Sequence, residues 1–222
     1  MRKLLRGIIE FRRNRRPEYA ATFARLALGQ APDALFVACS DSRVVPNLFA
    51  STEPGDLFVL RNVGNIVAPC GMDGASESDE SEGAALEFSV LSLKVSDVIV
   101  CGHSECGAMR ALVEGREKLP LPHMASWLRH AQPALDRHRS GAFGPSDLAP
   151  HNQVGQLNTL LQLEHLRSYP FIREAEEEGR IQLHAWWFDI AGADVYEWRE
   201  SRKAFVLVDE QSIESGRRPV SG

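Results

Sequence analysis

The chain has 222 residues, enough for one domain with a substantial apolar core. Its 25 basic and 30 acidic side chains give a formal net charge of −5, which provides no general basis for binding nucleic acid or an anionic membrane. No apolar run approaches the roughly 20 residues of a membrane-spanning helix, the N-terminus lacks the apolar stretch of a secretory signal, and the four cysteines show no dense disulfide spacing. We therefore expect a single cytoplasmic domain spanning residues 1–222.

The first 29 residues are expected to form a helical arm. Two helices are predicted over residues 3–28, interrupted at Pro17 and ended by Gly29. Each carries an apolar stripe at helical spacing, the first with Leu4, Ile8 and Phe11 and the second with Tyr19, Phe23 and Leu26.

The rest of the chain alternates between strand and helix patterns. Apolar runs predict buried parallel strands at 34–39, 56–61 and 97–101, a later strand at 181–188, and two short antiparallel edge strands at 194–198 and 204–208. Helices are expected at 84–95, 106–114, 122–139 and 151–178, the last divided at 168–170. Residues 71–83 and 141–150 are expected to be surface loops, and 211–222 a flexible tail. This order predicts an α/β fold with a central, mostly parallel β-sheet flanked by helices.

Two short polar segments follow buried strands. One is Cys39-Ser40-Asp41-Ser42-Arg43, and the other is Gly102-His103-Ser104-Glu105-Cys106-Gly107. Ligands in open α/β sheets bind beyond the carboxyl ends of the strands, so Cys39, His103 and Cys106 are expected to converge. Two thiolates and an imidazole suit Zn²⁺, and three protein ligands leave a fourth position open, as in catalytic zinc sites. Taken singly, Cys39 is equally well explained as a small core residue, and the His-x-x-Cys spacing arises often by chance.

Three motifs in this order resemble those of the β-class carbonic anhydrases: Cys39 to Arg43, Arg61-Asn62-Val63-Gly64-Asn65, and Gly102 to Gly107. The resemblance extends from about Phe11 to about Val208. It implies a lyase that hydrates CO₂ reversibly to bicarbonate and a proton by attack of zinc-bound hydroxide, with one Zn²⁺ per chain. It also implies a homodimer or a dimer of dimers, with the N-terminal arm packed on a partner subunit.

The resemblance also assigns roles to single residues. Asp41 would orient the hydroxide and Arg43 would hold that carboxylate; from the residues alone, a surface salt bridge is the alternative. Gln30 matches an amide that donates to bound CO₂ or bicarbonate in plant-type members, although by itself it is an exposed helix-end glutamine. Phe58 and Phe88 match pocket-lining aromatic positions but would be core residues by periodicity, and Gly107 matches a backbone N–H near the substrate.

Members of the family fall into two sets according to the fourth zinc position. In one set the motif Asp can become the fourth ligand in a closed state, which bicarbonate favours by binding beside a Trp, an Arg and a Tyr. This chain keeps only Arg61, with Phe36 and Phe188 at the other two positions. Phenylalanine supplies no N–H or O–H, so we predict the plant-type, open-site subclass, with Asp41 paired to Arg43 rather than to zinc.

Two other functions fit the same motifs. One is hydrolysis of CS₂ or COS on the same fold by the same zinc chemistry. The other is a non-catalytic zinc-binding module, which has no need of the Asp41–Arg43 pair. The substrate is expected to be a small molecule in every catalytic case, with no nucleic-acid or membrane partner.

Overall fold

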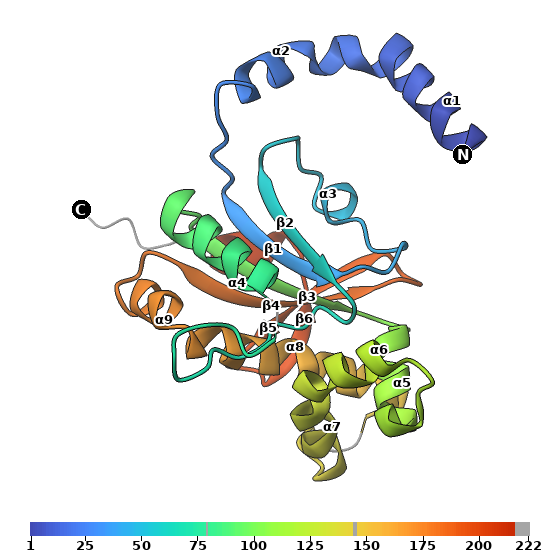
Figure 1. The fold of residues 1–222 in the computed structure, drawn as a ribbon, viewed down its shortest axis with the longest axis vertical. Coiled ribbons are helices and arrows are strands. Elements are labelled where there is room, and N and C mark those ends of the chain that lie inside the picture. Colours follow the sequence, from blue (N-terminus) through green and yellow to red (C-terminus); the bar gives the residue numbers. More distant parts are fainter. Residues whose placement is uncertain (79, 144–145, 216–222) are drawn as a thin grey trace.

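A computed structural model describes residues 1–78, 80–143 and 146–215 of the chain. The described residues form a six-stranded sheet in the order β2-β1-β3-β4-β5-β6, flanked by helices (Figure 1). The predicted α/β fold with a mostly parallel sheet is therefore confirmed. Within the described ranges, no helix is both long enough and apolar enough to cross a bilayer.

The strands lie close to their predicted positions. They are β1 (Ala34–Cys39), β2 (Leu57–Asn62), β3 (Asp97–His103), β4 (Gln182–Asp189), β5 (Asp194–Arg199) and β6 (Ala204–Leu207). The pairs of β1 with β2, β1 with β3, and β3 with β4 are parallel, whereas β5 and β6 add antiparallel edges. Strand β3 runs two residues further than predicted, so that His103 is its last residue.

The helices of the body are short, apart from α8. They are α3 (Pro46–Phe49), α4 (Glu80–Glu87), α5 (Gly107–Gly115), α6 (Pro122–Trp127), α7 (Gln132–Arg139), α8 (Pro150–Ser168), α9 (Pro170–Glu177) and α10 (Glu210–Ser215). The single helix predicted over 122–139 is divided by a 3₁₀ segment, Leu128–Ala131, because Pro133 in the first turn of α7 has no N–H to continue the ladder. Helix α10 occupies the first residues of the expected flexible tail, and residues 216–222 lie outside the described ranges.

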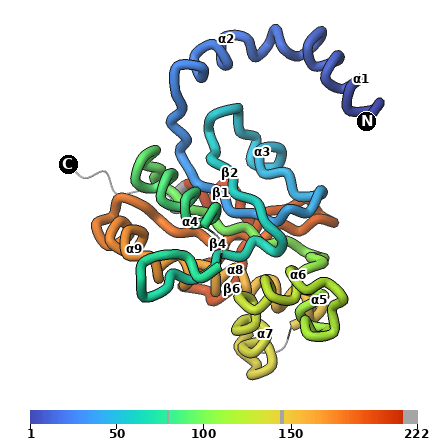
Figure 2. Tube along the Cα trace, in the orientation of Figure 1, coloured from blue at the N-terminus to red at the C-terminus, as the bar shows by residue number. Residues whose placement is uncertain are grey.

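The predicted interruption of the N-terminal arm at Pro17 is wrong. Helices α1 (Arg2–Glu10) and α2 (Arg16–Leu26) are joined by a π-helical segment, Phe11–Arg15. Pro17 lies in the first turn of α2, where its missing N–H is tolerated, and the wider turn before it absorbs the change. Figures 1 and 2 show the arm standing away from the sheet. None of its residues is buried, and Leu4 and Ile8 are 67% and 63% exposed.

The two faces of the sheet are covered unequally. On one face, Leu35, Val37, Val98 and Val100 of the central strands pack with side chains of α4, α8 and α9 in the largest cluster of buried residues. The other face carries a smaller cluster built on Phe36, Ile99, Cys101 and Phe188, with Phe49 of α3 packed against it. Both faces of β1 are therefore buried, as its continuous apolar run predicted.

The acidic segment 71–83 is not entirely a solvated loop. Its end forms the first turn of α4, and Glu82 is only 2% exposed. The Glu82 carboxylate accepts hydrogen bonds from the Ala68 N–H (3.0 Å) and from the Asn62 side chain (3.1 Å). The prediction of a solvated loop is wrong for Glu82, because the sequence does not distinguish a carboxylate that meets specific donors in the interior from one that faces solvent.

Candidate metal centre

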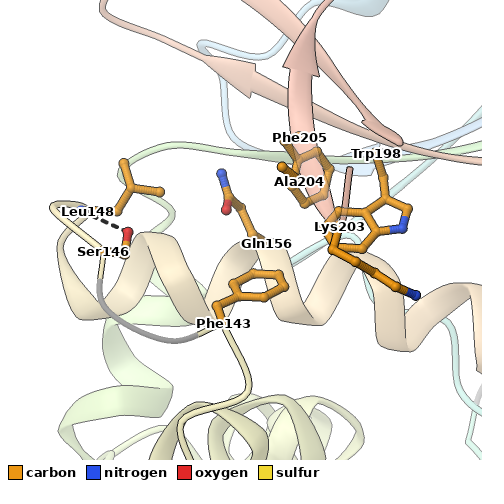
Figure 3. Close-up of a pocket in the computed structure, with 8 residues that line it drawn as sticks. All are labelled: Phe143, Ser146, Leu148, Gln156, Trp198, Lys203, Ala204 and Phe205. Carbon is orange, nitrogen blue, oxygen red and sulfur yellow. Dashed lines mark hydrogen bonds between the residues drawn. The ribbon is translucent and has the colours of Figure 1, made fainter. Parts of the chain in front are cut away.

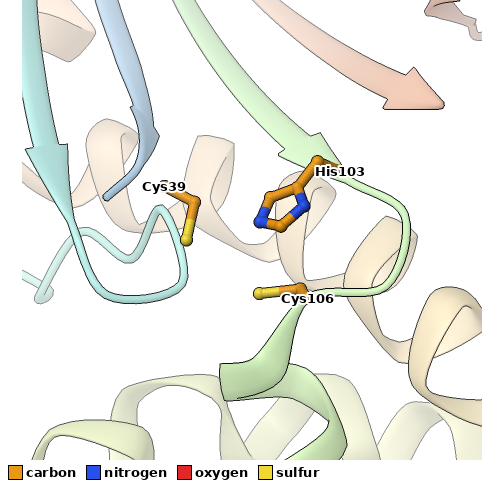
Figure 4. A group of neighbouring side chains, drawn as sticks. All are labelled: Cys39, His103 and Cys106. Carbon is orange, nitrogen blue, oxygen red and sulfur yellow. The ribbon is translucent and has the colours of Figure 1, made fainter. Parts of the chain in front are cut away.

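The arrangement of the central strands creates the site. Strand β1 lies between its parallel neighbours β2 and β3, so the strand order reverses between β1 and β3. In open α/β sheets, ligands bind beyond the carboxyl ends of the strands at this point. Cys39 ends β1, His103 ends β3, and Cys106 is the N-cap of α5. Their ligand atoms all lie within 4.8 Å of one another, and Figure 4 shows the three side chains turned toward a common point. The predicted ligand set is therefore confirmed as a buried group.

The imidazole of His103 is oriented as a metal ligand. Its Nδ1 lies 2.9 Å from the Ser104 carbonyl oxygen, so Nδ1 carries the proton and donates it there. Its Nε2 is buried and has no hydrogen-bond partner among the described residues. A buried ring nitrogen without a partner is costly unless a metal occupies its lone pair, and the fixed tautomer leaves that lone pair free. The donor set thus fits Zn²⁺ with one protein nitrogen and two sulfurs.

The two thiols are close enough to share a proton. A hydrogen bond from the Cys106 thiol lowers the pKa of Cys39, and the same bond, together with burial, raises the pKa of Cys106. The Gly64 N–H adds a further hydrogen bond to the Cys39 sulfur at 3.3 Å. One sulfur is thus stabilised as a thiolate even without metal, and a divalent cation would favour loss of the remaining proton.

Asp41 and Arg43 form a bidentate pair beside the ligands. Arg43 donates from Nε to Asp41 Oδ1 at 2.9 Å and from a terminal nitrogen to Oδ2 at 2.7 Å, and its backbone N–H also reaches Oδ1 at 3.0 Å. These bonds hold the pKa of the Asp41 carboxyl well below its usual range. A further bond from Arg43 to the Glu105 carbonyl oxygen (3.0 Å) ties the first motif to the loop between His103 and Cys106.

The Arg61 side chain is hydrogen-bonded to main-chain carbonyl oxygens. Its guanidinium donates to the Cys39 carbonyl oxygen from Nε (3.0 Å) and from a terminal nitrogen (2.9 Å), and to the Asp41 carbonyl oxygen at 2.7 Å. Phe36 is fully buried against the edge of Trp186, and Phe188 stacks on Phe49 with ring centroids 4.6 Å apart. Of the three positions expected to bind bicarbonate in the closed state, Arg61 is thus already hydrogen-bonded to the main chain. Phe36 and Phe188 offer only hydrocarbon rings.

The other predicted site residues fall into two groups. Gly107 begins α5 directly after Cys106, with open space around its Cα. Gln30 is exposed before β1 begins, and Phe58 and Phe88 contact one another with ring centroids 5.9 Å apart. Phe58 pairs with Leu35, four residues before Cys39, which places it about 13 Å along the strands from the zinc ligands. Within one chain, therefore, the fold does not bring Gln30, Phe58 and Phe88 to the metal centre.

Sequence reasoning missed the polar groups that hold the segment 62–68. Asn158 and Gln162 of α8 are 1% and 0% exposed and bind this segment, as does Trp127 at the end of α6. Asn152 at the start of α8 binds the ligand loop by accepting from the Glu105 N–H at 2.8 Å. The available signal was the spacing of Asn158 and Gln162, which puts two amides on one helical face among apolar residues.

A surface cavity is formed by residues other than those of the metal centre. A cavity of about 260 Å³ opens between α8 and the β5–β6 hairpin (Figure 3). Phe143 and Trp198 stack across it with ring centroids 5.8 Å apart. None of the predicted site residues lines this cavity.

Comparison with known proteins agrees with this geometry. Residues 34–195 match the family model described as carbonic anhydrase. A carbonic anhydrase of Pseudomonas aeruginosa is 40% identical over 210 residues, covering 95% of this chain and 93% of that protein. Carbonic anhydrase 1 of Escherichia coli O157:H7 is 40% identical, with 93% and 91% covered.

Solved structures give the same result. The β-carbonic anhydrase CcaA superposes with a TM-score of 0.87 at 35% identity, covering 94% of this chain and 99% of that one. A structure described as one of two tetrameric β-carbonic anhydrases of Sordaria macrospora matches with a TM-score of 0.74 at 28% identity, with 88% and 95% covered. With its buried Cys39–His103–Cys106 centre, the chain belongs to the β-class carbonic anhydrases, the zinc lyases that hydrate CO₂ reversibly to bicarbonate.

Proposed function

We propose that this carbonic anhydrase has the open, plant-type zinc site, in which Asp41 stays on Arg43 and leaves the fourth zinc position to solvent or substrate. The observation that carries the proposal is the bidentate pair, in which Arg43 engages both carboxylate oxygens of Asp41. Arg43 is itself anchored on the Glu105 carbonyl oxygen. To reach the metal, Asp41 would have to break two charge-assisted hydrogen bonds.

The surroundings of Arg61 support the same state. A closed site favoured by bicarbonate needs donors for that anion, and the Arg61 guanidinium already serves the carbonyl oxygens of Cys39 and Asp41. Phe36 and Phe188 offer no polar hydrogen. A bicarbonate bound there would be desolvated without replacement partners, so binding would contribute little to closing the site.

In the reaction, Asp41 and Gly107 position the reactants. Bound Zn²⁺ supplies the Lewis acidity that makes a water molecule nucleophilic near neutral pH. Asp41, kept ionised by Arg43, accepts a hydrogen bond from the attacking oxygen and so directs its lone pair toward CO₂. The Gly107 backbone, exposed beside Cys106, is free to donate to a substrate oxygen.

A second copy of the chain completes the site in this proposal. Gln30, Phe58 and Phe88 lie toward the other end of the strands, and Gln30 and Phe88 are exposed. The apolar residues Leu4, Ile8, Phe11 and Phe23 of the arm are also exposed. A partner subunit that covers the arm and the surface around Gln30 and Phe88 would exclude water from both. It would bring Gln30, Phe58 and Phe88 to the zinc site of that partner subunit. The tetrameric relatives from Sordaria macrospora are consistent with such assembly.

Sedimentation tests the assembly. Removing residues 1–16 should lower the sedimentation coefficient and the melting temperature, because the arm loses its contacts with the partner. A mixed-subunit experiment tests the shared site: combining Gln30→Ala chains with Cys106→Ala chains should restore part of the activity, since one hybrid site then has intact residues from both. Unchanged sedimentation and no recovery would contradict the proposal.

Stopped-flow CO₂ hydration by the zinc-loaded protein is the central functional measurement. We expect activity that rises with pH without cooperative inhibition by bicarbonate. Faster turnover of CS₂ or COS than of CO₂ would favour the hydrolase alternative, and a folded zinc protein without turnover of either would favour the non-catalytic module. A crystal structure at about pH 8 with an Asp41 oxygen roughly 2.0–2.2 Å from zinc would contradict the open site.

A further inference from the structure

The segment 63–68, which follows β2, is buried from Gly64 to Ala68 yet has no regular secondary structure. Its backbone groups are satisfied by side chains from other parts of the fold. Trp127 Nε1 donates to the Val63 carbonyl oxygen at 2.8 Å, Asn158 donates to the Gly64 carbonyl oxygen at 3.1 Å, and the Tyr169 hydroxyl donates to the Ala68 carbonyl oxygen at 2.9 Å. Side chains of α6, α8 and Tyr169, together with those of Asn62 and Glu82, thus fix the conformation of this segment.

One peptide unit of this segment reaches the metal centre. The unit joining Val63 and Gly64 accepts the Trp127 indole proton on its oxygen and donates its N–H to the Cys39 sulfur at 3.3 Å. A hydrogen bond accepted by an amide oxygen strengthens the bond that the same amide donates. Trp127 is therefore linked to a zinc ligand through a single peptide.

The next peptide unit is fixed by two buried amides. Gln162 accepts the Val67 N–H on Oε1 at 2.8 Å, so its Nε2 must donate to Asn158 Oδ1, which it does at 2.7 Å. The Asn158 Nδ2 group is then the one directed to the Gly64 carbonyl oxygen. Neither amide can be flipped without losing these bonds, because the Val67 N–H can only donate and therefore requires the Gln162 oxygen.

Gly64 itself has little room to move. Its φ is +87°, a conformation that favours glycine, and a Cβ there would lie 3.2 Å from both Ala108 Cβ and Met109 Cε. Both contacts belong to α5, the helix that begins after Cys106. Gly64 is thus held between the sulfur of Cys39 and the helix that carries the other thiol.

We propose that Trp127 and Asn158 are positioning residues for the Cys39 zinc thiolate, acting through the two peptide units that meet at Gly64. They hold the Gly64 N–H on the sulfur, which pre-organises the thiolate for zinc and reduces the electron density that it donates to the metal. The proposal concerns the ligand set alone and does not depend on whether the fourth position is open or closed.

The test compares Trp127→Phe with Tyr169→Phe. Each variant keeps an aromatic ring and removes one hydrogen bond to a carbonyl oxygen of the same segment, but only Trp127 bonds to the peptide that reaches Cys39. Zinc affinity is measured by competition with a chromophoric chelator at fixed pH, and the Co²⁺-substituted proteins are compared in their sulfur-to-cobalt charge-transfer band. Loss of an outer hydrogen bond around a metal typically weakens metal binding about 10- to 100-fold.

We expect Trp127→Phe to weaken zinc binding by about 10-fold or more and to move the charge-transfer band to longer wavelength, with Tyr169→Phe close to the unmodified protein in both. Asn158→Leu should act in the same direction, and Thr159→Val, equally buried on α8 and bonded only within that helix, should not. Equal losses in Trp127→Phe and Tyr169→Phe would overturn the proposal, because they would indicate general loosening of the segment. An unshifted band in Trp127→Phe, or failure of both Trp127→Phe and Asn158→Leu to fold, would overturn it as well.

Discussion

A charged cluster at the far end of the sheet makes stability depend on pH in a defined direction. His184 of β4 lies between Asp97 of β3 and Glu197 of β5, with Nε2 2.9 Å from Asp97 and Nδ1 3.2 Å from Glu197. Burial is the largest single influence and lowers the pKa of His184, but the hydrogen bonds and charges of the two carboxylates together outweigh it and raise the pKa to about 9. Both ring nitrogens must carry protons to serve both carboxylates, so the folded protein favours the imidazolium.

The size of the effect follows from the two pKa values. The rise from the ordinary 6.5 to about 9 corresponds, at about 1.36 kcal/mol per pKa unit, to roughly 3 kcal/mol. Because the folded pKa is raised, this stabilisation is fully present below about pH 6.5 and is lost as the pH rises through about 9. The side chain is 24% exposed, so solvent screening places the measured value toward 2 kcal/mol, again as a rough figure.

Urea unfolding of the zinc-loaded protein and of His184→Gln at several pH values measures this contribution. The difference in unfolding free energy between them should fall by about 2–3 kcal/mol between pH 6 and pH 10. His184 pairs with Ile99, four residues before the zinc ligand His103, so its substitution should leave zinc binding unchanged. Taking the difference in unfolding free energy between the two proteins at each pH therefore removes the pH dependence of zinc binding. His123→Gln, at an exposed position of α6, provides the control. A difference for His184→Gln that stays constant across this pH range would contradict a raised pKa of His184 in the folded protein.

Three further predictions concern the metal centre. Cys106→Ala should lose zinc and activity together, because a three-ligand site has no spare donor; full zinc content by metal analysis would contradict the ligand assignment. Arg43→Met should keep zinc but lower kcat/KM by about 100-fold, since Asp41 loses both charge-assisted bonds and is released toward the metal; unchanged stopped-flow kinetics would argue against a role for the pair. Gly64→Ala should lower the unfolding free energy by about 2–4 kcal/mol through its positive φ and its contact with Met109, and an unaltered urea midpoint would contradict this account.

The sequence alone determined the location and chemistry of the ligand set. Apolar runs ending at Cys39 and near His103 predict neighbouring parallel strands, and the carboxyl ends of parallel strands meet at one edge of a sheet. Because this relation depends on local patterning and on a general rule of α/β topology, two residues 64 positions apart could be brought together without a structure. The pairing of Asp41 with Arg43 could also be predicted, because the two residues are only two positions apart in the sequence.

The roles of groups whose partners are distant in sequence became evident only from the three-dimensional fold. Glu82 lies in an acidic stretch that resembles a solvated loop, but it accepts the Ala68 N–H in the interior. Arg61 donates to the carbonyl oxygens of Cys39 and Asp41, at and just beyond the end of β1. Periodicity reports which face of an element is apolar, whereas a buried polar group is defined by the specific donor or acceptor that it meets. The same limit applies to Gln30, because its distance from the zinc ligands depends on how the chain before β1 is placed in space.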